Sequence, residues 1–306
     1  MSVQSRRRTR RAIDGVLLLD KPYGITSQAA VTRAKTQLSA AKTGHTGTLD
    51  PMATGLLPLA FGEATKFAQT LLNADKGYFA TVRLGTTTST GDLEGEVLST
   101  QPVNVDRAQI ETAVAQFRGE IEQMPPMYSA LKHAGKPLYE YARAGTEIAR
   151  CPRRITITAL EIEAWEADNV CLRIECSKGT YVRVLAEDIG RALGCGATLA
   201  ALRRTGVGRF LVEDAVTLEA WAQMNEEQML DTLLPVDALL AGVPSFELDA
   251  EQSRRMRLGQ AVELRRTVDP GLVRVYGPGS YFLGVADASP EGRLLPRRMV
   301  STCSKA

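Results

Sequence analysis

Residues 44–55, GHTGTLDPMATG, hold one carboxylate, Asp50, in a setting that suits chemistry. Three glycines, three threonines and a proline in twelve residues cannot sustain a helix or a long strand. Pro51 biases Asp50 toward an extended backbone, and the glycines allow a backbone or ligand to approach closely because they carry no Cβ. The pattern predicts a rigid loop that presents a carboxylate at its tip. Such a group can serve as a nucleophile or as a base.

An Asp-Pro pair in a glycine-rich loop is most often only a turn, so its surroundings decide the interpretation. Residues 20–27 read DKPYGITS and residues 62–66 read GEATK. Further along stand Tyr78, residues 178–183 (KGTYVR) and residues 202–204 (LRR). Together these segments resemble the motifs of the TruB family, the bacterial tRNA pseudouridine synthases. The resemblance extends over most of the chain.

The resemblance implies the isomerisation of uridine to pseudouridine at position 55, in the T-loop of tRNA, with Asp50 as the catalytic residue. That reaction breaks a glycosidic C–N bond, turns the uracil and joins its C5 to the sugar. The sequence has no G-x-x-x-x-G-K-[ST], no G-x-G-x-x-G and no cluster of His or Cys ligands, and we expect no cofactor and no metal. Asp50 could attack uracil C6 or ribose C1′, or act as a base at the sugar; the sequence leaves these routes open.

A nucleophilic aspartate in a dry site needs a nearby cation, since burial raises the pKa of a carboxyl group. Arg183 is the predicted partner, and the resemblance implies the same ion pair. By spacing alone, an arginine here is more often a surface cation. However, Tyr181 and Arg183 lie off the apolar stripe of the helix expected at 182–193, so the core does not account for them. Lys21 and Pro22 are expected to buttress the aspartate loop.

The target base must leave folded RNA, at a cost of a few kcal/mol that stacking in the pocket offsets. The resemblance implies that Tyr78 packs on the flipped uracil, that Tyr181 lies beside it and that Leu202 forms a pocket wall. Without it, each of the three would be assigned to the core. His45, one of two histidines, would suit a general base. The resemblance implies instead that it shapes the space left by the flipped nucleotide, and we expect no catalytic role for it.

The elements expected around these residues give an α+β fold. A short apolar run that ends at a proline predicts the first strand, and apolar alternation predicts later ones, with a bulge near 158–159. Apolar stripes predict helices, with Ser27, Asp106 and Thr180 as caps. We expect a mixed, largely antiparallel sheet with flanking helices over 1–245, the pseudouridine synthase fold, and a small β domain over 246–306 similar to a PUA-type RNA-binding module. The expected strands of the larger part are 15–19, 55–61, 78–84, 155–162 and 170–176, and its expected helices are 28–39, 63–72, 106–117, 182–193 and further helices to about 240.

Residues 119–154 interrupt this pattern. They contain four prolines and show no strong apolar period, and a stretch of this length without regular structure is usually functional or mobile. The resemblance implies a flexible, thumb-like insertion that clamps an RNA stem-loop. Its basic and aromatic side chains favour a nucleic-acid surface: Tyr128, Lys132, His133, Lys136, Tyr139, Tyr141 and Arg143.

The charge of the chain is unevenly distributed, although its net value is only +2. Residues 1–11 hold five arginines and no acid, residues 211–249 hold nine acids and no base, and residues 250–306 hold ten bases against five acids. This favours an anionic partner, here the T-arm stem-loop of tRNA. We expect a monomer without an obligate protein partner.

Other features predict a cytoplasmic location. No apolar run is long enough to span a bilayer, so we expect no membrane association. The arginines near the N-terminus lack the apolar region of a secretory signal. Five cysteines without C-x-x-C spacing indicate neither a zinc site nor a disulfide framework.

Three alternatives compete with this interpretation. Residues 129–132 match the S-x-x-K of serine acyl-enzymes and residues 42–44 match K-T-G, but the order is reversed and no S-D-N lies between. A non-catalytic RNA-binding or RNA-folding module would not need a carboxylate at position 50 facing an anionic ligand. A guide-RNA-dependent pseudouridine synthase of the same superfamily is the third, and the 119–154 insertion favours a stand-alone enzyme over it.

Overall fold

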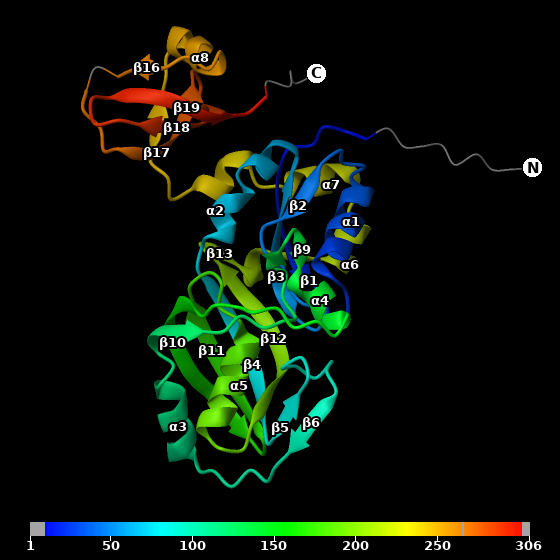
Figure 1. Cartoon of the computed structure of the whole chain (residues 1–306). Helices are drawn as coiled ribbons and strands as arrows, with labels where there is room; N and C mark the ends of the chain where they lie inside the picture. Colours follow the sequence, from blue (N-terminus) through cyan, green and yellow to red (C-terminus); the bar gives the residue numbers. More distant parts are fainter. Residues whose placement is uncertain (1–9, 265, 302–306) are drawn as a thin grey trace, which may run out of the picture.

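The computed structural model describes residues 10–264 and 266–301. Arg6 to Arg8 and Cys303 lie outside these ranges. The larger part of the chain forms a ten-stranded sheet in the order β14-β1-β3-β12-β4-β11-β10-β7, with β2 paired to β3 and β13 to β12 (Figure 1). Two neighbouring pairs, β1–β14 and β3–β12, are parallel and the others are antiparallel. The prediction of a mixed, largely antiparallel sheet is therefore confirmed. Its strands are β1 Gly15–Lys21, β2 Thr43–His45, β3 Thr54–Phe61, β4 Lys76–Leu84, β7 Gly119–Gln123, β10 Arg153–Glu166, β11 Asn169–Cys176, β12 Ala197–Val207, β13 Phe210–Leu211 and β14 Val216–Thr217.

Helices cover this sheet and enclose three apolar cores. One core lies among β4, β10, β11, α3 and α5, a second among β1, β3, α1 and α6, and a third among β1, β3, α2 and the 3-10 segments. Leu202, on the central strand β12, packs against the first two. None of the helices in the described ranges is long and apolar enough to cross a membrane. The helices of the larger part are α1 Ser27–Gln37, α2 Ala68–Leu72, α3 Arg107–Ala115, α4 Leu138–Arg143, α5 Val182–Ala192, α6 Leu218–Gln223 and α7 Glu226–Asp231, with short 3-10 segments at Gly62–Lys66, Val212–Asp214 and Val236–Leu240.

Several elements predicted from the sequence are confirmed. The strands expected at 15–19, 55–61, 78–84 and 170–176 are β1, β3, β4 and β11. In β10, pairing with β11 jumps from Ile157 to Ala159, so Thr158 forms the predicted bulge. Asp106 caps α3 through a capping box with Gln109, as predicted. The helix expected at 63–72 is divided at Phe67 into the 3-10 segment and α2.

The cap assignments at Ser27 and Thr180 are wrong. Thr26 caps α1 by accepting a hydrogen bond from the Ala29 backbone, and Ser27 is buried with a different set of partners, described below. Thr180 donates its hydroxyl hydrogen to the Ser177 carbonyl. The cap of α5 is the next residue, Tyr181, which makes no capping bond with its side chain.

The prediction of helices from 193 to about 240 is wrong over its first part. Residues 197–207 form β12, which pairs with β4 along its length and with β3 near Arg203. Alanine, leucine and arginine favour a helix in isolation. A partner strand on each side satisfies the backbone and overrides that preference. Helices α6 and α7 follow only after residue 217.

The insertion at 119–154 is more regular than predicted. The insertion begins with strand β7 and ends with the first residues of β10, and these two segments pair with each other. Between them lie a hairpin, β8 Lys132–His133 and β9 Lys136–Pro137, and helix α4. In Figure 1 this hairpin and α4 lie in front of the large sheet. Another ribbon, of β5 Thr86–Thr88 and β6 Val97–Thr100, extends from the end of β4.

The C-terminal residues form a small β domain, as predicted. Its sheet has the order β15-β17-β18-β19-β16, accompanied by a helix, α8, that the sequence did not reveal. It contacts the larger part through the Phe67–Phe282 ring pair, whose centroids lie 5.6 Å apart, and through the Tyr276 hydroxyl, which donates to Asp237. Its elements are β15 Ser245–Glu247, α8 Ala250–Arg257, β16 Val262–Glu263, β17 Gly271–Gly277, β18 Tyr281–Ala288 and β19 Arg293–Met299.

Candidate active site

Asp50 lies in the turn between β2 and β3, and its neighbours anchor that turn on both sides. Leu49 is buried in the core beside α1, and Met52 is buried in the core beside α5. Ser27 fixes the backbone of Leu49 twice, since its hydroxyl donates to the carbonyl oxygen at 2.9 Å and accepts from the N–H at 2.8 Å. The Asp50 side chain remains 40 % exposed. The loop therefore presents a carboxylate from a fixed backbone, open to a ligand.

Lys21, at the end of β1, buttresses this loop as predicted. It is fully buried, and its Nζ donates to the carbonyl oxygens of Pro22, Ile25 and Pro51 at 2.9, 2.8 and 3.3 Å. Burial lowers the pKa of Lys21 to about 8, although the nearby Asp50 charge opposes the decrease. The ammonium thus ties the segment after β1 to the segment after Asp50.

Arg204 holds the other side of the loop from strand β12. This arginine is buried, and it donates from Nε to the Leu56 carbonyl at 2.7 Å and from Nη2 to the Gly47 carbonyl at 3.2 Å. Gly55 lies directly against its backbone: a Cβ there would stand 2.3 Å from the Arg204 carbonyl oxygen, and its φ is +98°. Only glycine permits this approach without displacement of β12.

Asp50 forms an ion pair with Arg183, the second residue of α5. Arg183 Nη2 lies 3.0 Å from Asp50 Oδ2, and the arginine side chain is only 8 % exposed. Two backbone carbonyls fix the guanidinium further, because Nη1 donates to Thr90 at 3.0 Å and Nη2 donates to Tyr128 at 2.7 Å. A buried and immobilised cation therefore faces a partly exposed carboxylate. The guanidinium therefore lies where it can compensate negative charge on Asp50 or on a group bound to it.

Asp92 is a second carboxylate beside the same arginine, and it was not among the residues predicted for the site. Its Oδ2 lies 3.6 Å from Arg183 Nε, and its side chain is buried. Its Oδ1 accepts from Thr90 Oγ1 at 2.5 Å and from the Glu94 N–H at 3.1 Å. The only local signal is the pair of glycines that flank this acidic turn, Gly91 and Gly95. Arg183 is thus held between one exposed and one buried acid.

The two tyrosines predicted for the site both lie within reach of the Asp50 charge. That charge contributes to raising the pKa of Tyr78 and of Tyr181, for which burial is the main cause. Tyr78 is on β4, opposite Arg204, and packs against the core beside α5. Tyr181 is held through its backbone by a residue that the sequence did not identify, Gln123, at 2.7 and 3.1 Å.

Leu202 lies on β12 between the core beside α5 and the core beside α1, next to β3, the strand that follows the loop. Its carbonyl oxygen accepts from Thr54 Oγ1 at 3.5 Å, and its side chain is half-buried. The structure thus brings Leu202 close to the start of β3, four residues after Asp50.

His45 is the last residue of β2 and is half-buried. Its Nδ1 accepts weakly from the Gly47 N–H at 3.4 Å. Burial lowers the pKa of His45, and the Arg204 charge lowers it further. The imidazole is therefore neutral at pH 7, which suits a residue that fills space next to a ligand.

His45 should make the stability of the protein depend on pH. Between the ordinary histidine pKa of 6.5 and the lower folded value, the unfolded chain binds a proton that the folded chain does not, so stability falls as the pH is lowered through this window. We expect His45→Gln to lose part of that dependence in urea unfolding at pH 7.5 and pH 5.5. His133→Gln, at the exposed histidine of the hairpin, is the control. Identical pH dependence in wild type and His45→Gln would contradict the assignment.

Three family models match the chain. The model described as "TruB family pseudouridylate synthase (N terminal domain)" matches residues 35–182, "tRNA pseudouridylate synthase B C-terminal domain" matches 183–241, and "Pseudouridine synthase II TruB, C-terminal" matches 244–300. The matched family models define the chain as a pseudouridine synthase, an enzyme.

Relatives of known name agree over nearly the full chain. The chain is 55 % identical over 300 residues to "tRNA pseudouridine synthase B" of Aromatoleum aromaticum, covering 98 % of this chain and 97 % of that protein. It is 56 % identical over 306 residues to the protein of the same name from Ralstonia nicotianae, covering 97 % of each. The chain belongs to the TruB family.

Solved structures show the same architecture at greater distance. The archaeal box H/ACA sRNP Nop10-Cbf5 complex contains a chain that matches with a TM-score of 0.70 and 25 % identity, over 95 % of this chain and 86 % of that one. A Cbf5-Nop10-Gar1 complex matches with a TM-score of 0.70 and 28 % identity, over 94 % and 84 %. The fold is therefore shared well beyond the bacterial relatives.

Proposed function

We propose that this enzyme isomerises uridine to pseudouridine at position 55, in the T-loop of tRNA, and that Asp50 is its catalytic residue. The observation that carries the proposal is the ion pair in which a partly exposed carboxylate faces a buried, fully bonded arginine. The names of relatives at 55–56 % identity support tRNA as the substrate. The guide-dependent alternative is supported only by structural neighbours at 25–28 % identity.

The chemistry that Asp50 performs follows from its position. Its carboxylate is partly exposed at the tip of an anchored loop, so it can attack uracil C6 or ribose C1′ or remove a proton at the sugar. In each route the negative charge of Asp50 passes to the substrate when Asp50 forms its new bond, and it returns to Asp50 when that bond breaks. Arg183 lies close enough to compensate the charge in both places. No group that needs redox chemistry takes part in any of the three routes.

The neighbouring side chains would receive the flipped base. Tyr78 stacks on the uracil, Tyr181 lies beside it, Leu202 forms a wall, and His45 shapes the space that the nucleotide leaves. These roles are supported by the proximity of the side chains to Asp50. The Asp50 charge contributes to the raised pKa of both tyrosines, and Leu202 lies beside the start of β3. A neutral His45 adds no charge to compete with Arg183 for Asp50.

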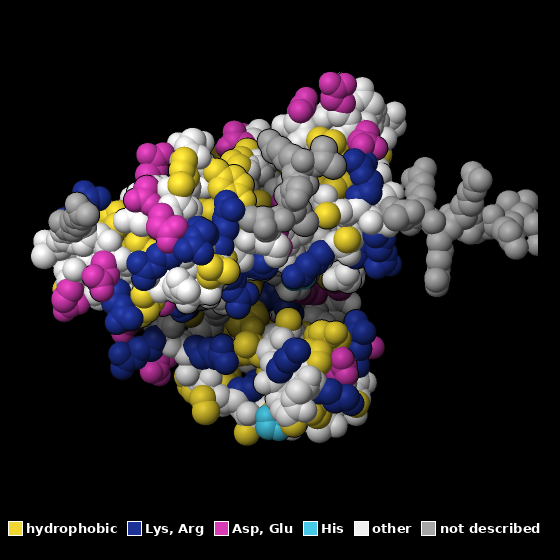
Figure 2. All heavy atoms as spheres, turned by 90° about the horizontal axis from the view of Figure 1, so that it is seen from above, with side chains coloured by type: hydrophobic (Ala, Val, Ile, Leu, Met, Phe, Trp, Pro, Cys, Tyr) yellow, Lys and Arg dark blue, Asp and Glu magenta, His cyan; other side chains and the backbone are white. Residues whose placement is uncertain are grey.

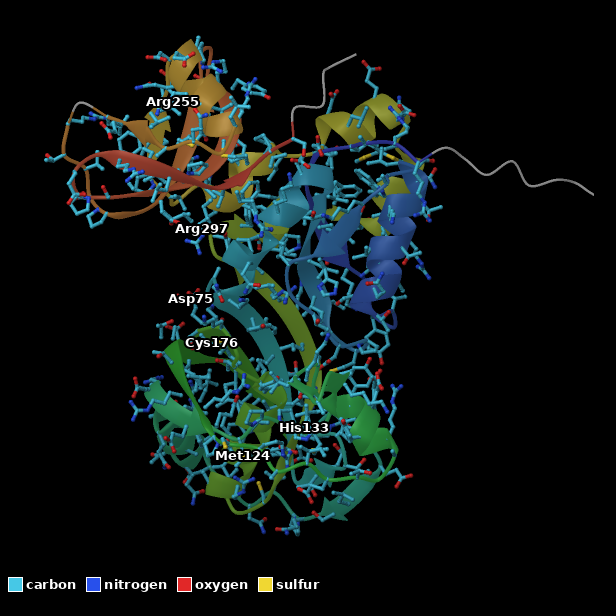
Figure 3. The ribbon with its side chains drawn as sticks, turned by 45° about the horizontal axis from the view of Figure 1, so that its top comes forward. Asp75, Met124, His133, Cys176, Arg255 and Arg297 are labelled. Atoms are coloured by element: carbon cyan, nitrogen blue, oxygen red, sulfur yellow. The ribbon has the colours of Figure 1, made fainter. Side chains whose placement is uncertain are left out.

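The proposed RNA surface combines the catalytic domain, residues 1–245, with residues 246–306 as a PUA-like RNA-binding domain. Figure 2 shows Lys and Arg side chains on both sides of a hollow in the face seen from above. In Figure 3, Arg297 lies on the side of the second sheet that faces Asp75 of the larger part, whereas Arg255 lies on α8 away from it. An anionic stem-loop lying in this hollow would meet cations from both domains.

The insertion would close over the RNA from the other side. Figure 3 places His133 and Met124 on it, at the opposite end of the large sheet from Arg297. On α4 and its hairpin, cations lie over tyrosine rings: Lys136 Nζ is 5.8 Å from the centroid of the half-buried Tyr141 ring, and the Arg143 guanidinium is 5.5 Å from that of the exposed Tyr139. Such pairs offer a base a stacking face and a phosphate a charge. The enzyme would act as a monomer in the cytoplasm, without an obligate protein partner.

Shortening the insertion should weaken RNA binding more than it slows the chemical step. Replacing residues 130–146 by a Gly-Ser linker removes the hairpin and α4 but keeps β7 and the Tyr128 carbonyl bonded to Arg183. We expect affinity for a T-arm stem-loop to fall by about tenfold or more, since each lost base stack contributes about 1–3 kcal/mol. The triple substitution of Lys132, Lys136 and Arg143 by Ala should lower the dependence of affinity on salt. Filter binding at two salt concentrations measures the affinity and its salt dependence, and single-turnover rates measure the chemical step. If the affinity of the shortened protein were unchanged, the RNA surface would lie elsewhere.

The function itself is tested with purified protein and an unmodified tRNA transcript, without cofactor. Chemical mapping should find one pseudouridine, in the T-loop. Product at another position would reject the site specificity. A requirement for an added guide RNA would favour the guide-dependent enzyme, and tight binding without product would favour the binding module.

A further inference from the structure

Tyr23 is an aromatic side chain with no place in the core. It lies in the turn after β1 and is 67 % exposed. Single exposed apolar residues are common on protein surfaces and by themselves indicate nothing. The support beneath this one is unusual.

The turn that carries Tyr23 is fixed at both ends and to the aspartate loop. Lys21 Nζ donates to the carbonyl on each side of the turn, at Pro22 and Ile25. The N–H of Gly24, the next residue, donates to the Pro51 carbonyl at 2.9 Å. Pro51 follows Asp50 directly, and its carbonyl also accepts from Lys21. The residues on both sides of Tyr23 are therefore hydrogen-bonded, and one of these bonds joins its turn directly to the loop of Asp50.

An exposed ring on such a support suits the binding of a nucleobase. Every base has a π-face, so stacking needs no particular sequence, and a tyrosine has only two side-chain torsions to immobilise. The Asp50 side chain, 40 % exposed, belongs to the loop to which this turn is bonded. A uridine that enters the site necessarily brings its neighbouring nucleotides to the rim.

We propose that Tyr23 is a substrate-binding residue whose ring stacks on a base of the RNA loop adjacent to the flipped uridine. The proposal rests on the proposed function, and it adds a contact at the rim to those within the pocket. The ring, rather than the hydroxyl, makes this contact. Its contribution is to affinity and not to the chemical step.

The first test compares Tyr23→Ala with Tyr23→Phe on a T-arm stem-loop. Tyr23→Ala should raise the Kd about tenfold and change the single-turnover rate at saturating RNA by less than about twofold. Tyr23→Phe should bind like wild type. Leu98→Ala, at a side chain of equal exposure on β6, is the control and should have no effect. Wild-type affinity in Tyr23→Ala, or equal losses in Tyr23→Ala and Tyr23→Phe, would overturn the proposal.

The second test detects stacking directly. In a Trp165→Phe background the remaining native tryptophan, Trp221, is fully buried, so adding Tyr23→Trp introduces one exposed indole. RNA binding should quench its fluorescence, also when Asp50→Asn is present and no reaction occurs. Binding without quenching would overturn stacking. Neither the affinity nor the quenching measurement needs turnover. If wild-type protein bound the RNA but made no pseudouridine, the proposed function would be refuted, and the two measurements would still show whether Tyr23 stacks on the RNA.

Discussion

Asp50→Asn should abolish pseudouridine formation while RNA binds as well as in wild type or slightly better. Asparagine keeps the size of the side chain and the loop that Leu49 and Ser27 anchor. It removes the nucleophile and the negative charge, and an amide can neither attack the substrate nor serve as the base. Loss of a nucleophile costs roughly 10⁴-fold or more in turnover. Binding should not suffer, because a negative group has left a site for an anion.

Both quantities must be measured on one tRNA, with affinity from filter binding and turnover from tritium release at C5-labelled uridine. Glu94→Gln is the matched control. Glu94 has an exposed side chain that lies near Asp50. The pKa of Glu94 is raised mainly by partial desolvation, then by the Asp92 charge and then by the Asp50 charge. Its substitution removes a nearby charge without removing the nucleophile, so turnover should be retained. If Asp50→Asn turned over near the wild-type rate, the non-catalytic binding module would become the better interpretation of this fold.

The sequence predicted the parts of this site that are local. Glycines and a proline predict the loop of Asp50, a short apolar run that ends at a proline predicts β1, and apolar alternation predicts β4 and β11. The pairing of Asp50 with Arg183 is predicted by two arguments together: an acid in a dry site needs a nearby cation, and the family resemblance implies this ion pair. The ion pair is present at 3.0 Å.

The missed features depend on contacts between segments far apart in the chain. Asp92 and Gln123 lie in turns and strands whose composition is unremarkable, and they matter only because the fold brings them to Arg183 and to Tyr181. Strand β12 was mistaken for a helix because its own residues favour one, and pairing on both sides reversed that preference. Ser27 was assigned to the helix that it begins, whereas its hydroxyl serves the loop of Asp50.

Arg183→Ala should reduce turnover by roughly 10²-fold or more, since the charge on Asp50 is then uncompensated through the reaction. Arg183→Lys should restore only part of the rate. A lysine cannot reproduce the planar fork that bonds Asp50, Thr90 and Tyr128 at once. Turnover by tritium release and affinity by filter binding measure the effect on the same RNA. Wild-type turnover in Arg183→Ala would show that Asp50 works without its cation.

The buried Asp92 complicates this experiment and also supplies its control. Removing Arg183 leaves the Asp92 carboxylate unpaired in the interior, which costs roughly 3 kcal/mol or more of unfolding free energy, so a loss of activity could reflect a loss of fold. The double substitution Arg183→Ala with Asp92→Asn removes that unpaired charge. It should regain much of the stability in urea unfolding and none of the turnover. Stability and turnover that recovered together would make Arg183 a structural residue; stability that recovered alone would assign its effect to the charge on Asp50.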